Sequence, residues 1–555
     1  TGGRINNPSS LVERQITSEN MVWNNTLRYN KRFNERNNIN VLLGTEAVSN
    51  STTALLENDQ NFPNQDPSLR FLGNGLNIQQ VIATENRGEW SLLSFFGNVG
   101  YNYNDEFFIN GTIRRDGSSR FGPANRWGNF YSGAIAWNLL NEKWVANLLP
   151  TVSKMKLRAS YGQLGNQNIG NYPYASIVSN TNNYVLGSSP TPVQGYSVSS
   201  LGNPDVKWET STQTDVGLDI GIWKDRLSLT VDYFDKINSN MLVAVPLPMI
   251  GGAANAPFIN DGSVQNQGFE FDLHYSNNAR KLKYEVSANL ATIQNKVISI
   301  PVPIQGGRID DGVYATLTTT GHPIGSFYGY QMAGIFQNSD DIFKSAYQGP
   351  GVRPGDVKYK DMNGDGVIDA KDRTFLGSAI PKFTYGASLT LSYSNFDLFI
   401  LAQGSYGNKI YLQVNQDIEG FYRPFNVTER VFNERWHGEG TSNTMPLVSW
   451  RDQANNIKEP SSRFLQSASY ARLKNIQLGY TIPKELVNKL HIKGLRFYVT
   501  GLNLVTLTKY TGLDPEMHIS NNVAVEKYPS DVAAGIDWGT YPSAKSYIIG
   551  ANLSL

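Results

Sequence analysis

The 555-residue sequence contains no cysteine, which excludes disulfides, thiolate metal sites and cysteine nucleophiles together. Charged residues are scarce at 17%, and 48 basic residues nearly balance 47 acidic ones, so nothing indicates a nucleic-acid partner. Apolar runs are short: the longest aliphatic bursts, such as 398–402, fall far below the ~18–20 residues of a membrane-crossing helix. These absences exclude a helical membrane protein, but they leave open a membrane protein of another kind.

Patterns of catalytic residues are also missing. No G-x-S-x-G nucleophile elbow and no P-loop occur in the sequence. The histidines are scattered and show no pairing at metal-ligand spacing: His274, His322, His437, His491 and His518. A Ser/His or Asp/His set that only the fold assembles leaves no such pattern in the sequence. We expect no enzymatic activity.

The sequence instead shows a repeated alternation of apolar and polar residues with period two. In the segment 93–103, one face carries Leu93, Phe95, Val99, Tyr101 and Tyr103, opposite Ser94, Asn98, Gly100 and Asn102. Segments 226–234 and 547–555 alternate in the same way. This period indicates β-strands. A soluble sandwich alternates too, but small polar residues on one face and Tyr or Trp near strand ends are typical of outer-membrane barrels.

The spacing of these segments is lopsided, because very short links alternate with very long ones. The short links are 102–106, 223–226, 276–281 and 394–395, and the long ones are 47–89, 165–206, 238–264, 295–383, 405–469 and 504–544. Outer-membrane barrels have short periplasmic turns and long extracellular loops. We therefore predict an all-β fold, a transmembrane antiparallel β-barrel. About fifteen strands, each near the ~9–11 residues of a tilted crossing, are expected at 19–32, 38–47, 90–103, 106–115, 129–139, 154–164, 207–222, 225–237, 265–276, 281–294, 384–393, 395–404, 470–481, 493–503 and 545–555.

The short links also assign the two sides of the membrane. If the short links are periplasmic, the strand at 284–290 runs outward and the strand at 384–393 runs back inward. The segment between them, 295–383, is then extracellular. Its short apolar piece at 328–336 therefore does not cross the membrane. The loop 405–469 is extracellular by the same argument. Bacterial single-chain barrels normally have an even number of strands. We therefore expect residues 1–555 to be the C-terminal part of a larger barrel.

One stretch, DMNGDGVIDAKD at 361–372, has the spacing of a calcium-binding loop. Calcium takes about six to eight oxygen ligands, and an EF-hand-type loop supplies them at fixed positions around a sharp glycine turn, here Gly366. Position 12 is Asp rather than the usual bidentate Glu, and no long helices flank the loop, so we expect a structural Ca²⁺ site rather than a sensor. A polar turn pair without an ion is the other interpretation. The predicted ligands are Asp361, Asn363, Asp365, Val367 through its carbonyl, Asp369 and Asp372.

Several longer stretches resemble the SusC/RagA family of TonB-dependent outer-membrane transporters. In chain order they are IRRDGSSRFG (113–122), KLRASYGQLGNQ (156–167), NPDVKWETSTQTDVGLD (203–219), NQGFEFDL (266–273), GSFYGYQMAGIFQ (325–337), PGDVKYKDMNGDGVIDAKDRTFLGSAIPKFTYG (354–386), SYARLKNIQLGYTIP (469–483) and GLRFYVTGLNL (494–504). Each motif alone is weak. Together, and in this order, they are highly specific.

The resemblance implies a roughly 22-stranded barrel whose lumen holds an N-terminal plug domain. It also implies a SusD-like surface lipoprotein that acts as a lid, energy transmitted by the TonB complex, and a dimer of barrel–lipoprotein pairs. The fifteen strands would be roughly strands 8 to 22, and the plug, the TonB box and the first seven strands would lie outside this chain. The implied function is import of oligosaccharides or peptides across the outer membrane of a bacterium of the Bacteroidota. A non-transporting subunit that scaffolds a larger outer-membrane assembly or secretion complex is the alternative.

Two further groups of side chains are candidates for binding. Arg114, Arg115 and Arg120 lie close together beside Asp116 at the outer end of a predicted strand. We expect rim salt bridges there, with an anionic substrate or the phosphate of lipopolysaccharide as the alternatives. The loop 405–469 is rich in aromatic residues, which are enriched at protein interfaces and also stack on sugars. We expect these to face the lid, with substrate contact and packing within the loop as the alternatives: Tyr406, Phe421, Tyr422, Phe425, Trp436 and Trp450.

Overall fold

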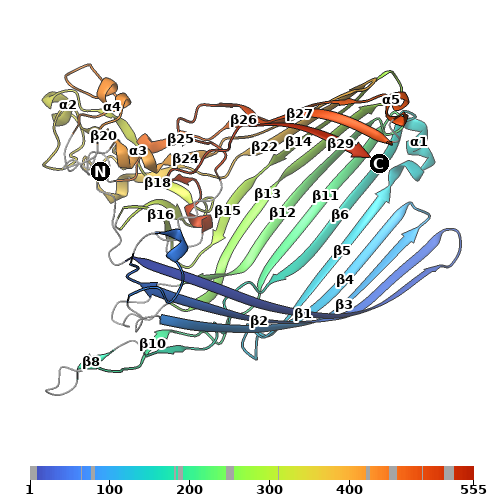
Figure 1. The fold of residues 1–555 in the computed structure, drawn as a ribbon, viewed down its shortest axis with the longest axis horizontal. Helices are drawn as coiled ribbons and strands as arrows, with labels where there is room; N and C mark the ends of the chain where they lie inside the picture. Colours follow the sequence, from blue (N-terminus) through green and yellow to red (C-terminus); the bar gives the residue numbers. More distant parts are fainter. Residues whose placement is uncertain are drawn as a thin grey trace. The chain divides into compact units, whose positions relative to one another are not determined.

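The computed structural model is dominated by one large antiparallel sheet (Figure 1). It describes residues 9–63, 66–76, 82–180, 183–185, 192–244, 256–310, 312–419, 426–448, 459–489, 492–517 and 530–554. Neighbouring strands of the sheet follow the order β1 (Ser10–Arg32), β2 (Asn37–Gln60), β3 (Ile82–Tyr103), β4 (Phe107–Ser118), β5 (Trp127–Asn138), β6 (Val152–Asn166), β11 (Glu209–Ile222), β12 (Leu227–Ala244), β13 (Phe258–Asn277), β14 (Leu282–Thr292), β22 (Phe383–Tyr393), β23 (Phe396–Tyr406), β26 (Tyr470–Thr481), β27 (Gly494–Thr508) and β29 (Ser546–Ser554). A short strand, β15 (Gln294–Ser299), pairs with β13 beside this path.

All fifteen predicted strands are present, and their order in the sheet is their order in the chain. The prediction of a long link over 47–89 was wrong. Strand β2 continues to Gln60 and β3 begins at Ile82, and the two remain paired from Asn37 to Asn58. The apolar alternation fades after residue 47 into Ser, Thr and Asn. Backbone hydrogen bonds nevertheless extend the ladder, because strand pairing does not require apolar side chains.

The chain divides into two compact units, of which the first comprises 1–135, 161–212 and 239–261. In this unit, the pairings of β1 to β4 place Leu27, Leu43, Gly97 and Ile113 in one row across the sheet, and Thr26, Gly44, Phe96 and Arg114 in the next. Successive residues of a strand point to opposite faces. One face is therefore mainly apolar and the other mainly polar.

A small core lies beside the strands of this first unit. The buried side chains of Phe121, Phe130, Val206 and Trp208 pack together. The indole N–H of Trp208 donates to the carbonyl oxygen of Arg126 at 3.1 Å, which satisfies its buried polar atom. Two short ribbons accompany this unit: β7 (Ile177–Ser179) with β10 (Ser197–Ser200), and β8 (Tyr184–Val185) with β9 (Pro192–Val193).

The second unit comprises 136–160, 213–238 and 262–555. Its strands are joined alternately by short links and by long links, and the short link between β26 and β27 contains a helix, Lys484–Asn488. At the tight turn between β22 and β23, Ser394 has a φ of 53°, the left-handed conformation that two-residue hairpins require. The described parts of the long links 294–382, 407–468 and 509–545 fold together, and we call them the loop body.

The loop body contains its own small sheets and most of the second unit's buried core. The sheets are β16 (Ile304–Asp310), β17 (Val313–Thr318), β18 (Ser326–Tyr330) and β21 (Arg373–Gly377); β19 (Met332–Ile335) with β20 (Val357–Tyr359); and β25 (Leu465–Ser467), β24 (Lys409–Leu412) and β28 (Ile536–Asp537). One core cluster draws on all three long links: Ile309, Ala315, Phe327, Tyr411, Phe464 and Ile536. The apolar piece 328–336 belongs to these small sheets, which confirms that it is not a strand of the large sheet.

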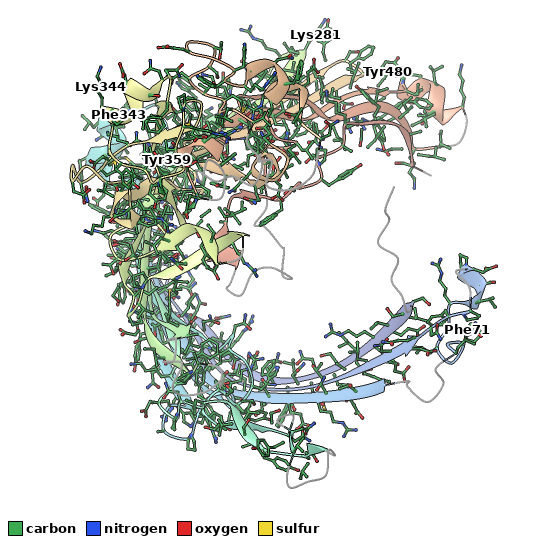
Figure 2. The ribbon with its side chains drawn as sticks, turned by 90° about the vertical axis from the view of Figure 1, so that its left-hand side faces the viewer. Phe71, Lys281, Phe343, Lys344, Tyr359 and Tyr480 are labelled. Atoms are coloured by element: carbon green, nitrogen blue, oxygen red, sulfur yellow. The ribbon has the colours of Figure 1, made fainter. Side chains whose placement is uncertain are left out.

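The helices are short and lie in the links: α1 (Lys143–Leu148), α2 (Ser339–Phe343), α3 (Gln413–Ile418), α4 (Glu429–Glu434) and α5 (Lys484–Asn488). None of those in the described part of the chain has the length and apolarity needed to cross a membrane. Helix α2 leaves Phe343 at the surface of the loop body, 88% exposed (Figure 2).

Candidate functional site

The acidic loop 361–372 lies in the loop body between β20 and β21. Its first carboxylate organises the turn: Asp361 accepts the N–H of Gly364 at 2.6 Å and the N–H of Gly366 at 2.9 Å. Both glycines have positive φ, 76° and 82°, a conformation that side chains disfavour. The glycines therefore allow the chain to wrap around the Asp361 carboxylate.

The middle of the loop is held by a bridge to the segment after α2. The N–H of Tyr347 donates to the Gly366 carbonyl at 2.8 Å, and the N–H of Ile368 donates to the Tyr347 carbonyl at 2.9 Å. This pairing turns the N–H and C=O of Val367 away from Tyr347. The Val367 N–H donates instead to Asp365 at 3.0 Å. In this pairing the N–H and C=O of one residue point the same way, so the Val367 carbonyl lies on the side of Asp365.

The end of the loop is closed by Asp369 and Asp372. Asp369 caps a single 3-10 turn, and the buried Asp372 accepts the N–H of Asp369 and the N–H of Met362, each at 2.8 Å. A carboxylate oxygen has lone pairs beyond one hydrogen bond, and six oxygen donors of this kind suit a hard cation. Within the described residues, however, no three acidic or histidine side chains converge as a metal-binding group.

The arginines predicted to cluster at the rim do not come together. Arg114 faces the polar side, where it pairs with Asp116 at 2.8 Å and with Glu46 at 3.2 Å. Arg115, the next residue, points to the opposite face and lies over the ring of Trp127 at 5.0 Å. Arg120 donates to Asn171 at 3.2 Å and makes no described ion pair. The expected salt bridge is thus confirmed only for Arg114, because strand alternation separates neighbouring residues.

A second charged group lies on β6, β11 and β12 in the second unit. The guanidinium of Arg158 joins Asp219 at 3.1 Å and Asp232 at 3.0 Å, and Lys154 approaches Asp219 at 3.7 Å. Thr230 also donates to Asp219, at 3.2 Å. This face of the sheet is therefore lined by paired charges rather than by apolar side chains.

A buried ionic network surrounds Arg472 of β26, and the sequence patterns did not predict it. Its guanidinium donates to Asp514, to Glu516 at 2.6 Å and to Thr506 at 2.8 Å, and its side chain is only 3% exposed. Asp514 also accepts the backbone N–H groups of Ser543 and Glu516. Burial raises the pKa of Asp514, but these hydrogen bonds outweigh it and lower that pKa to about 2. The network fastens the link after β27 to the sheet.

Among the predicted aromatic contacts, Tyr406 and Trp436 pack within the chain. Tyr406 stacks on Phe383 with ring centroids 4.9 Å apart, and Trp436 packs beside a buried cluster that includes Tyr330 and Val357. The other four, Phe421, Tyr422, Phe425 and Trp450, lie outside the described residues. Of the histidines, His322 stacks on Phe375, and His491 and His518 also lie outside the described residues.

Comparisons with known proteins agree with this architecture. A family model described as TonB dependent receptor-like, beta-barrel matches residues 2–504. TonB-dependent receptor P3 of Formosa agariphila is 31% identical over 560 residues, covering 100% of this chain and 54% of that protein. TonB-dependent receptor SusC of Bacteroides thetaiotaomicron is 28% identical over 486 residues, covering 86% of this chain and 45% of that protein. The solved structure of the RagAB peptide transporter aligns with a TM-score of 0.81 at 26% identity, covering 98% of this chain and 56% of that one. The chain thus spans about half the length of these relatives.

Proposed function

We propose that this chain, which belongs to the TonB-dependent receptor-like β-barrel family, supplies barrel wall and outer loops to a nutrient importer. Its place is the bacterial outer membrane. The proposed activity is TonB-energised uptake of oligosaccharides or peptides. The observation that carries the proposal is the loop body, in which three long links on one side of the sheet pack into a single folded unit.

The polar face of the sheet supports a solute pathway. In the second unit Arg158 pairs with Asp219 and Asp232, and in the first unit Arg114 pairs with Asp116 and Glu46, so both units carry paired charges on a sheet face. A wide barrel with such a lumen leaks unless it is plugged. Coupling to the TonB complex is therefore assigned to the half of the full-length relatives that this chain does not span.

The loop body is the proposed docking surface for a SusD-like lipoprotein lid. Phe343 and Tyr347 are exposed aromatic side chains, and Tyr347 pairs through its backbone with the acidic loop. Aromatic residues are enriched in the centres of protein interfaces. A dimer of barrel–lipoprotein pairs is part of the same proposal. The relatives are named as receptors or transporters, and we propose no catalytic role.

The acidic loop is proposed to bind Ca²⁺ through Asp361, Asn363, Asp365, Asp369 and Asp372 and through the Val367 carbonyl. Its support is the ligand spacing, the two positive-φ glycines and the orientation of the Val367 carbonyl. The ion would stiffen the loop that pairs with Tyr347. Its role would therefore be structural, beside the surface proposed for the lid.

The lid proposal can be tested by co-purification of the full-length protein from outer membranes in mild detergent. Phe343→Ser should remove an exposed aromatic contact without disturbing a core. Phe71→Ser is the matched control, because Phe71 is 51% exposed on the link between β2 and β3. We expect at least about tenfold less surface lipoprotein with Phe343→Ser, and wild-type amounts with Phe71→Ser. Equal recovery with both variants would remove Phe343 from the interface.

A further inference from the structure

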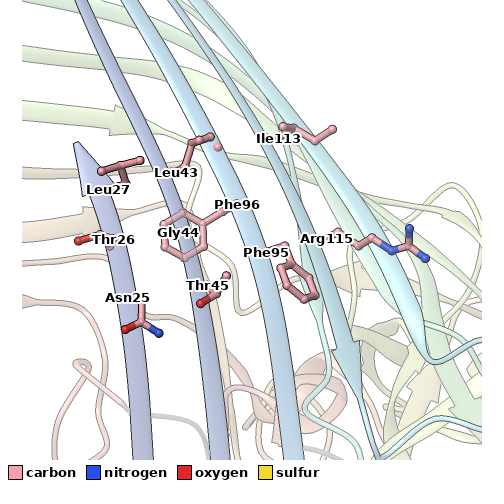
Figure 3. Close-up of a pocket in the computed structure, with 11 residues that line it drawn as sticks. Asn25, Thr26, Leu27, Leu43, Gly44, Thr45, Phe95, Phe96, Ile113 and Arg115 are labelled. Atoms are coloured by element: carbon pink, nitrogen blue, oxygen red, sulfur yellow. The ribbon is translucent and has the colours of Figure 1, made fainter. Parts of the chain in front are cut away.

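The first unit carries a hollow on its apolar face, formed by two adjacent rows of residues. One row contains Asn25, Thr45, Phe95 and Arg115, and the other row contains Leu27, Leu43, Gly97 and Ile113. Both rows line an open groove of about 560 Å³, whose floor is the backbone between them (Figure 3).

Gly97 is the reason for the hollow. Every other member of its row has a side chain, and a Cβ at Gly97 would approach Leu43 Cδ2 at 3.3 Å and Ile113 Cγ2 at 3.9 Å. The missing side chain therefore leaves a gap between two aliphatic walls. Leu27, Leu43, Phe95 and Ile113 remain exposed around it. In an outer-membrane barrel, exposed apolar residues of this face contact lipid.

Arg115 sits at the edge of this groove without a balancing charge. Among the described residues it makes no ion pair, and its one described contact is the ring of Trp127. Strand β4 begins at Phe107 after a short turn, and Arg115 lies about nine residues along the strand. This length is close to the ~9–11 residues that a tilted strand needs to cross the membrane. Arg115 therefore lies at the outer boundary of the membrane, on the side of the longer link between β4 and β5.

We propose that this groove binds a phosphorylated glycolipid of the outer leaflet, the lipid A part of lipopolysaccharide. The hollow at Gly97 takes one acyl chain, and the guanidinium of Arg115 holds a phosphate. Arginine suits this role because it is always charged and presents several donors to a phosphate. The groove is apolar around Gly97 and cationic at Arg115 on its outer edge. This arrangement matches a lipid with apolar acyl chains and an anionic phosphate. The proposal rests on the membrane location of the family and does not require the import function.

The test is native mass spectrometry of the full-length protein in mild detergent, titrated with lipid A and with dephosphorylated lipid A. The wild type should bind the phosphorylated form about tenfold more tightly, as a charge-assisted hydrogen bond allows. Arg115→Gln should lose this preference and bind both forms alike. Arg115→Lys should keep most of it, since the charge remains.

A second pair of variants tests the acyl chain independently of the phosphate. Gly97→Val fills the hollow and should weaken both lipid forms equally. Gly111→Val is the matched control: Gly111 lies on the same face of the neighbouring strand, and a Cβ there meets nothing within 4 Å. It should bind both lipids as the wild type does. A phosphate preference that survives Arg115→Gln, or wild-type binding by Gly97→Val, would overturn the proposal. Equal binding of phosphatidylglycerol would overturn the assignment to lipid A.

Discussion

Arg472 of β26 donates to the carboxylate of Asp514 in the link after β27, and both side chains are almost fully buried. Taking two charges out of water costs free energy that their attraction only partly returns. Here the cost is offset by further hydrogen bonds: Arg472 reaches Glu516 and Thr506, and Asp514 accepts two backbone N–H groups. The link between β27 and β29 is thereby anchored to the wall of the barrel.

Removing one side of this pair should be costly. Arg472→Met leaves Asp514 buried without its cation, and we expect the free energy of unfolding to fall by about 3–5 kcal/mol. Lys474→Met is the control: Lys474 shares Glu516 at 2.7 Å but its side chain is 24% exposed, so about 1 kcal/mol or less is expected. Denaturant unfolding in detergent micelles measures both. Equal losses would show that the Arg472 network adds nothing beyond a surface pair.

The same network predicts a response to acid. The pKa of Asp514 is lowered from 3.8 to about 2, so its charged form is favoured by folding. Its contribution to stability is complete above about pH 4 and is lost as the pH falls towards 2. Hydrogen exchange of residues 509–517, corrected for intrinsic rates, should lose protection in that window. Asp514→Asn should abolish this step, and an unchanged acid transition in that variant would assign it to another group.

Calcium should stabilise the acidic loop through Asp365. Asp365→Asn keeps an oxygen that can accept the Val367 N–H but removes a negative charge. The variant should therefore match the wild type in chelator and lose most of the calcium-dependent rise in Tm. Asp361→Ala is less informative, because it also removes the hydrogen bonds to Gly364 and Gly366. A wild-type Tm that is the same with calcium and with chelator would leave the loop as a turn without an ion.

The small core of the first unit should be sensitive to truncation. Phe121 is fully buried against Trp208, with ring centroids 4.9 Å apart. Phe121→Ala should cost about 3–5 kcal/mol because it leaves a cavity. Tyr196→Ala, at an exposed position of the same unit, should cost less than about 0.5 kcal/mol. The free energy of unfolding of both variants is measured in the same denaturant series. A small decrease for Phe121→Ala would mean that the surrounding core collapses into the cavity.

The strands could be predicted because their alternation is local. In β3, Phe95 and Asn98 differ in polarity according to the face that each side chain occupies, and the sequence shows this directly. The long ends of β1 to β3 could not be predicted, since their pairing depends on backbone hydrogen bonds that leave no side-chain pattern. The alternation that predicts β4 also places Arg114 and Arg115 on opposite faces, so the predicted cluster of these arginines was incompatible with the strand.

The loop body and the Arg472 network depend on contacts between distant parts of the chain. Ile309, Tyr411 and Ile536 meet in one core although hundreds of residues separate the first from the last. Single-sequence patterns carry no information on such contacts. The calcium-type spacing of 361–372 was visible in the sequence, but only the structure shows that Tyr347 pairs with it.

Native mass spectrometry of the full-length protein from its own outer membrane tests most directly whether this chain is part of an importer. We expect a surface lipoprotein bound to the barrel, together with a bound peptide or oligosaccharide that is released on activation. Recovery with assembly or secretion proteins, without a lipoprotein or a bound oligomer, would contradict import and favour a scaffold.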